Sequence, residues 1–302
     1  MGEFMGRNKR IYFDYVKTYI QRYEKEGNKV IEQTADLSKC FERISKLDSV
    51  DRTYNMGNDK IRIQELKKVN EYWEILILKL RDEVMPGIAD DNGNYTIEIL
   101  EDGKYYCEST TMLYDPEKSI LIIQKNRYGL QPSNVEFLLD KINNDKNIKI
   151  ILKPIINKNK IELLNNGHAY RSLEIGIVNN IQEEIIEDST GIMGVLKNFQ
   201  KYKGNNVSIR IGYNKRCKKD ECLDSNMVID TINELYGNIH VNKLKTSIKF
   251  NDDTKVETID LLDDRIYDYE NLEYSKENPI THDRLINILK QLYKNKKNNI
   301  ML

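Results

Sequence analysis

The chain has 302 residues, of which 39% are hydrophobic and 31% are charged. This composition can bury a substantial core and excludes an intrinsically disordered chain. The 47 Lys and Arg residues nearly balance the 48 Asp and Glu residues, and the net charge of -1 excludes a global basic field.

Three features bear on where the protein works. The longest apolar runs fall far short of the roughly 20 residues that a membrane helix needs. The first ten residues lack the apolar stretch of a secretory signal. Four cysteines, at positions 40, 107, 217 and 222, are too sparse for a disulfide scaffold. We therefore expect a cytoplasmic protein without membrane contact.

The first half of the chain mixes strand and helix patterns. Residues 10–23 are rich in aromatic and β-branched side chains and predict a long strand. Residues 35–47 place apolar side chains at helical spacing behind Thr34, which is a candidate N-cap. The other expected elements are strands within 51–82, a hairpin around 101–103, a strand at 119–124 and a helix after Pro132.

A polar stretch at residues 143–147 marks a candidate boundary, which predicts an N-terminal domain over 5–147 and a C-terminal domain over 148–302. The expected elements of the second half are strands at 148–156, 161–164, 172–178 and 207–213, two strands around 251–253, and helices at 190–202, 225–236 and 281–294. The order predicts an α+β protein with mostly antiparallel mixed sheets, helices packed on one face and two subdomains.

Cys217 and Cys222, with His240 eighteen residues further on, form the best candidate for a zinc site. A structural zinc site has four ligands, usually as two paired knuckles, and this sequence shows one. The two lysines between the cysteines fit an exposed loop. Neither a metal nor any other cofactor is therefore part of our prediction.

The other catalytic signatures are weak. The three histidines, His168, His240 and His282, have no accompanying nucleophile motif of the G-x-S-x-G type. The chain contains no phosphate-binding loop of the P-loop or dinucleotide-binding type. A P-loop nucleotide hydrolase and a dinucleotide-binding enzyme are therefore disfavoured, as is a hydrolase with a nucleophilic triad. We lean towards a protein that is not an enzyme.

Acidic residues gather between Asp252 and Glu270 and include Asp260, Asp263 and Asp264. Grouped carboxylates are what a magnesium-dependent phosphoryl-transfer site requires, although most such groups are solvated turns. A metal-dependent nuclease is accordingly the alternative function.

Two basic loops are candidate nucleic-acid-binding sites. The first consists of Gln124, Lys125, Asn126, Arg127 and Tyr128, between an apolar strand and a helix. The second contains Lys215, Arg216, Lys218 and Lys219. Lys and Arg bind phosphates, Asn and Gln read base edges, and Tyr stacks on bases. For each loop taken alone, the simpler interpretation is a solvated connection.

The block from Thr111 to Gly129 reads TMLYDPEKSILIIQKNRYG. It resembles poorly characterised proteins of bacterial and phage mobile elements, with a core of LYDP, an apolar strand and Q-x-N-R. It is also similar to the DNA-binding subunit of the Kiwa anti-phage defence system. The resemblance covers about 60 residues, from Trp73 to about Leu139, and implies a DNA-binding or sensing role carried by Gln124, Asn126 and Arg127.

The leading hypothesis is a non-catalytic nucleic-acid-binding or sensing protein of a mobile element or anti-phage defence locus. Its partners would be DNA or RNA, or a protein from the same locus, and oligomers are compatible with the sequence. A module that binds only proteins, through its sheet edges, is the second alternative.

Overall fold

The computed structural model describes residues 7–24, 29–57, 59–81, 87–97, 100–143, 145, 147–156, 164, 169–178, 192, 195, 206–213, 221–249, 256–298 and 300. The strands are β1 (Arg7–Glu24), β2 (Lys29–Thr34), β3 (Thr53–Met56), β4 (Asp59–Val69), β5 (Tyr72–Arg81), β6 (Ile88–Ala89), β7 (Tyr95–Thr96), β8 (Tyr106–Asp115), β9 (Ile120–Lys125), β10 (Ile148–Pro154), β11 (Ala169–Val178), β12 (Asn206–Gly212), β13 (Val241–Lys249), β14 (Glu257–Asp260) and β15 (Tyr267–Tyr274). The helices are α1 (Ser38–Ser45), α2 (Pro132–Asn143), α5 (Ser225–Tyr236), α6 (His282–Lys296) and the short 3-10 helix η2 (Leu261–Asp264).

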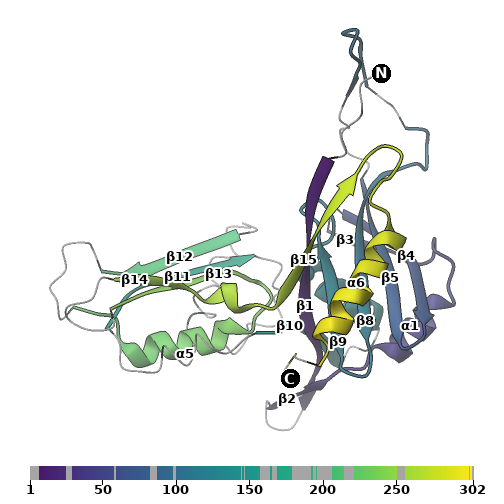
Figure 1. Ribbon diagram of the computed structural model, residues 1–302. Coiled ribbons are helices and arrows are strands. Elements are labelled where there is room, and N and C mark those ends of the chain that lie inside the picture. Colours follow the sequence, from purple (N-terminus) through teal and green to yellow (C-terminus); the bar gives the residue numbers. More distant parts are fainter. Residues whose placement is uncertain are drawn as a thin grey trace.

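These strands form a nine-stranded sheet, a four-stranded sheet and a separate hairpin of β6 and β7 (Figure 1). Every strand pairing in the described part of the chain is antiparallel. The α+β class with mostly antiparallel sheets is therefore confirmed. No helix in the described ranges has both the length and the hydropathy that crossing a membrane requires.

Strand β1 is the axis of the larger sheet because each of its edges pairs with two strands in succession. Along one edge, residues 12–17 pair with β9 and residues 19–24 pair with β2. Along the other edge, residues 7–14 pair with β15 and residues 16–22 pair with β10. A single strand of 18 residues thus holds together segments from both ends of the chain.

The four-stranded sheet, in the order β12-β11-β13-β14, is inserted between β10 and β15. The chain leaves the larger sheet after Ile155 and returns at Ile266, whose N–H donates to the Ile155 carbonyl at 2.7 Å. Since β10 and β15 belong to the larger sheet and α6 packs on it, the larger sheet takes strands from both sides of the boundary predicted after residue 147. The physical reason is the length of β1, because one of its edges has room for both β10 and β15.

Helices cover both faces of the larger sheet, whereas the sequence predicted helices on one face. On one face, α1 and α2 pack on β1, β4, β5, β8 and β9. On the other face, α6 lies across the sheet (Figure 1) and packs on Ile11, Phe13 and Tyr15 of β1. The alternation of β1 therefore serves two cores, since successive strand residues point to opposite faces.

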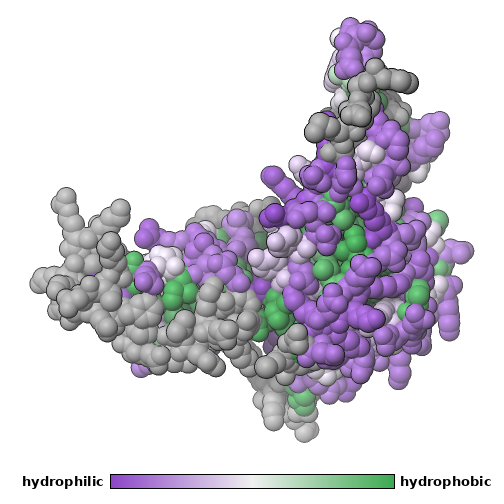
Figure 2. Space-filling model, in the orientation of Figure 1, coloured by the Kyte–Doolittle hydropathy of each residue, from purple (hydrophilic) through white to green (hydrophobic). Residues whose placement is uncertain are grey.

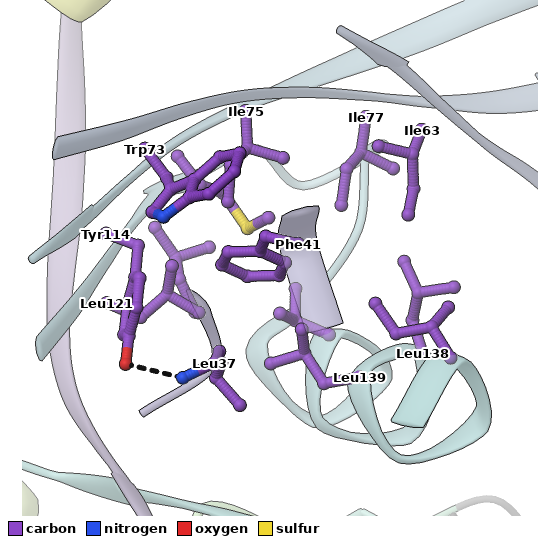
Figure 3. Packing of buried hydrophobic residues seen from close by; sticks show 14 of the residues in the cluster. Leu37, Phe41, Ile63, Trp73, Ile75, Ile77, Tyr114, Leu121, Leu138 and Leu139 are labelled. Carbon is purple, nitrogen blue, oxygen red and sulfur yellow. Dashed lines mark hydrogen bonds between the residues drawn. The ribbon is translucent and has the colours of Figure 1, made fainter. Parts of the chain in front are cut away.

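The core under α1 is built around aromatic contacts (Figure 3). The Phe41 ring meets Trp73 and Tyr114 edge-on, at centroid distances of 5.6 and 5.4 Å. The Tyr114 hydroxyl accepts from the Leu37 N–H and donates to the Ala35 carbonyl, both at 3.0 Å. This buried tyrosine therefore fixes where the chain leaves β2 and enters α1.

Two carboxylates hold the C-terminal turns of α6 on the sheet. The Tyr293 hydroxyl donates to Asp115 at 2.7 Å, and burial together with this bond raises the tyrosine pKa. Asp268 accepts from the Tyr15 hydroxyl and forms an ion pair with Lys296, both at 2.5 Å. The last helix is thus fixed by buried polar contacts as well as by apolar packing.

Most expected elements of the described residues are present, namely the long first strand, the strands at β5, β9, β10, β11 and β12, the β13–β14 pair, and helices α2, α5 and α6. The helix expected from residue 35 begins at Ser38 because Thr34 belongs to β2. The hairpin expected around 101–103 is replaced by the β6–β7 hairpin, whose turn is closed by Asp90 accepting from Asn94. The helix expected at 190–202 lies almost wholly outside the described residues.

Replacing Tyr114 with Phe should lower the free energy of unfolding by about 1–3 kcal/mol, because the buried Leu37 N–H loses its acceptor while the ring is retained. The Ala35 carbonyl still accepts from the Thr18 hydroxyl at 2.7 Å. Urea unfolding followed by circular dichroism measures the change. The matched control is Tyr95→Phe, on a residue that is 68% exposed. Equal stability of the two variants would contradict this role for the hydroxyl.

Candidate nucleic-acid interface

The first basic loop is a tight turn between β9 and α2. The Gly129 N–H donates to the Asn126 carbonyl at 3.1 Å, and the Gln131 side-chain amide donates to the same carbonyl at 2.7 Å. A Cβ atom at Gly129 would lie 2.5 Å from Thr110 Oγ1, so the close approach of the turn to β8 requires glycine there. The turn is consequently rigid at both ends.

Two of the polar residues predicted to bind nucleic acid instead build this turn. Gln124 is 6% exposed, and its Oε1 accepts from the Thr111 N–H at 2.9 Å. Asn126 donates to the Ser109 carbonyl at 2.9 Å and accepts from the Tyr128 N–H at 3.2 Å. Their side chains are hydrogen-bonded to the backbone of the protein, so reading of base edges by Gln124 and Asn126 stays a prediction that these contacts do not support.

The remaining residues of the turn face solvent. Arg127 is exposed, Tyr128 is 56% exposed and the Lys125 side chain is 53% exposed. Lys125 Nζ lies 3.2 Å from Asp14 Oδ1, a pair that solvent weakens. No carboxylate of the described residues pairs with Arg127.

Arg81, at the end of β5, completes this group. Its guanidinium donates to the Tyr128 carbonyl at 3.2 Å and lies 5.8 Å from the Tyr128 ring centroid. The Arg127 guanidinium lies at the same distance from that centroid. We refer to Arg81, Lys125, Arg127 and Tyr128 as the turn cluster. It places two guanidinium groups around one exposed aromatic ring.

The second basic loop cannot be placed in the same way. Lys215, Arg216, Lys218 and Lys219 lie outside the described residues, as does Cys217 of the candidate zinc site. Cys222 has a free thiol, and His240 is bonded through Nε2 to Glu136 at 2.8 Å. His240 therefore serves the contact between the smaller sheet and α2.

The acidic segment is divided between several elements. Asp260 caps η2 by accepting from the Leu262 N–H at 3.1 Å and pairs with Lys245 at 2.6 Å. The side chain of Asp264 lies outside the described residues. Within the ranges that the structure describes, no three His, Cys, Asp or Glu side chains gather as metal ligands would.

Of the histidines considered for catalysis, His168 lies outside the described residues. His282 begins α6, and its Nδ1 lies 3.0 Å from Thr111 Oγ1. Burial lowers the pKa of His282 below its usual value of 6.5. This histidine joins α6 to β8, which is a structural role.

Sequence reasoning missed Arg81 because 47 residues separate it from the turn that it contacts. It also treated Tyr267 and Tyr269 as part of an acidic segment, although they lie on β15 and are about half exposed. The alternation of tyrosine with polar residues from 267 to 271 was a usable signal for a half-exposed strand.

The fold and this surface define an α+β protein with a rigid basic and aromatic turn on its larger sheet. A family model described as a family of unknown function (DUF6731) matches residues 6–299, and the chain belongs to this family. No curated protein matches the chain.

Replacing Gln124 with Leu should lower the free energy of unfolding by about 1–3 kcal/mol, because the buried Thr111 N–H loses its acceptor. Arg127→Ala should change it by no more than about 0.5 kcal/mol, because Arg127 is exposed. Urea titration of both variants gives the comparison. A stable Gln124→Leu protein would return Gln124 to the list of candidate binding residues.

Protonation of His282 should destabilise the fold. The folded-state pKa is depressed, so the unfolded chain binds the proton more readily, and stability is lost as the pH falls through 6.5 towards the folded-state value. In His282→Asn, which keeps a polar atom near Thr111, this loss should be absent. Thermal unfolding between pH 7.5 and 5 measures the difference, and parallel pH profiles for the two proteins would refute it.

Proposed function

We propose that the protein is a non-catalytic nucleic-acid-binding or sensing protein, and that the turn cluster is its phosphate-binding site. The observation that carries the proposal is the presentation of Arg81 and Arg127 around the exposed Tyr128 ring by a turn whose backbone is fixed. Guanidinium groups bind phosphate oxygens in a planar, bidentate manner, and a tyrosine ring stacks on a base or sugar.

Electrostatics favour an anion at this position. The two guanidinium groups share one ring, and the described carboxylates pair with neither. Arg81 donates one N–H to the Tyr128 carbonyl, and its other donors are available to a ligand, as are those of the exposed Arg127. The net charge of the chain is -1, so the attraction is local to the turn cluster. A partner that supplies phosphate groups to a small basic patch fits this pattern.

The two alternatives have less support. A metal-dependent nuclease would need free carboxylates, yet Asp260 is engaged by Lys245 and by the backbone of η2. A module that binds only proteins would be favoured by a broad apolar surface. On the face shown in Figure 2, hydrophilic residues cover most of the larger sheet and α6, and apolar residues appear only in small separate patches.

The setting of this function is also a proposal. A role in a mobile element or anti-phage defence locus, with a partner protein from the same locus, rests on the resemblance of residues 111–129 alone. Action in the cytoplasm rests on the sparse cysteines of the sequence.

Fluorescence anisotropy with labelled DNA and RNA at two salt concentrations tests the proposal. Arg127→Ala should weaken binding by roughly 3- to 10-fold and reduce the slope of log affinity against log salt by about 1, because one phosphate contact is lost. Lys294→Ala, which removes an exposed charge from α6, is the matched control and should bind like the wild type.

In the same titrations, magnesium is added after binding has been measured, in order to test for cleavage of the probe. Cleavage of the probe would favour the nuclease instead. Absence of binding by the wild type at low salt would refute the proposal.

A further inference from the structure

Three tyrosines lie together on one face of the larger sheet, beside the turn cluster. Tyr12 on β1 is the cross-strand partner of Tyr269 on β15, and their ring centroids are 5.8 Å apart. The Tyr12 ring lies 6.0 Å from that of Tyr267. Tyr267 and Tyr269 are 48% and 47% exposed. We call Tyr12, Tyr267 and Tyr269 the tyrosine face.

These rings are outside the two cores of the sheet. Strand alternation sends Ile11 and Phe13 into the core beneath α6, so Tyr12 points to the opposite face. On that opposite face, the core under α1 and α2 takes Val16 from β1 but none of the three tyrosines. Cross-strand tyrosine pairs by themselves stabilise a sheet, so the pairs alone do not indicate a ligand.

Cations border the rings. The Arg10 guanidinium lies 4.7 Å from the Tyr269 ring centroid, and its Nε donates to Asn271 Oδ1 at 3.0 Å. Asn271 thereby holds Arg10 over the ring, while the side chain of Arg10 stays exposed. A guanidinium held over one of three neighbouring, mutually tilted tyrosine rings suits a ligand that carries both flat rings and negative charge.

Lys125 connects this face to the turn cluster. It is the cross-strand partner of Tyr12, so the two side chains lie on the same face of the sheet. The next residues of the chain form the turn that presents Arg127 and Tyr128. Lys125 is therefore both a member of the turn cluster and the neighbour of Tyr12 on the tyrosine face.

We propose that the tyrosine face binds the bases of single-stranded nucleic acid, while Arg10, Lys125 and the turn cluster bind its phosphates. Base faces are hidden inside a duplex and are free for stacking only in a single strand. This inference deepens the proposed function and depends on it. DNA and RNA strands share the stacking chemistry, and the experiment includes both.

The experiment compares single-stranded 12-mers of DNA and RNA with a duplex of the same sequence, by anisotropy of the full-length protein. Tyr269→Leu removes the aromatic ring and should weaken single-strand binding by about tenfold, with duplex binding unchanged. Tyr269→Phe keeps the ring and should bind like the wild type. Tyr95→Leu, on the separate β6–β7 hairpin, is the matched control and should also bind normally.

The outcomes separate this inference from the proposed function. If Arg127→Ala weakens binding but Tyr269→Leu and Tyr267→Leu do not, base stacking is refuted while phosphate binding stands. Equal affinity of the wild type for single strand and duplex would also overturn the inference. A loss of binding in Tyr269→Phe would assign the effect to the hydroxyl and overturn it too. If the wild type binds neither probe, both proposals fail.

Discussion

The pairing of β1 with four other strands is the constraint on which the rest of the structure depends. Its 18 residues are long enough for two partners in succession along each edge. Because the hydrogen bonds of β9, β2, β15 and β10 all go to one strand, the N-terminal segment cannot be displaced without opening the sheet on both sides. Such non-local pairing raises the contact order of the chain, which slows folding.

The same pairing explains how the smaller sheet is attached. At Tyr15 the second edge of β1 changes partner, since the Tyr15 carbonyl accepts from the Ile155 N–H at 3.0 Å and the Tyr15 N–H donates to the Ile266 carbonyl at 3.3 Å. The chain departs for the smaller sheet and returns at this one position. The half-buried Arg265 guanidinium donates to the carbonyls of Asn238 and Val241, which ties the returning chain to the smaller sheet.

The sequence predicted the local elements better than their assembly. Alternation over residues 10–23 was sufficient for β1, and helical spacing after Pro132 was sufficient for α2, because both patterns are set by neighbours along the chain. The pairing of β15 with β1 could not be predicted, since more than 250 residues of sequence separate each pair of partners. A composition change at residues 143–147 could not reveal that later strands return to the first sheet.

In the candidate site, too, the sequence predicted local features but not the contacts that depend on the fold. Arg127 and Tyr128 were predicted from residue type, and they are exposed. Gln124 was predicted from the same argument, but it is buried. Residue type alone does not tell whether a side-chain amide faces solvent or bonds a backbone N–H. Arg10 and Tyr269 became candidates only through the pairing of β1 with β15, and Arg81 only through its contact with Tyr128.

Within residues 111–129, some residues of the pattern have structural contacts and others face solvent. Tyr114 bonds the segment before α1, Asp115 holds Tyr293 of α6, and Gln124 satisfies the backbone of β8. Each of these residues has a structural task that any protein with this β8–β9 hairpin and these helices would share. A common LYDP and Q-x-N-R pattern is therefore expected from a common fold, whatever the proteins bind. Within the block, Arg127 has no such task among the described contacts, so evidence for a shared ligand must come from that position and from the surface around it.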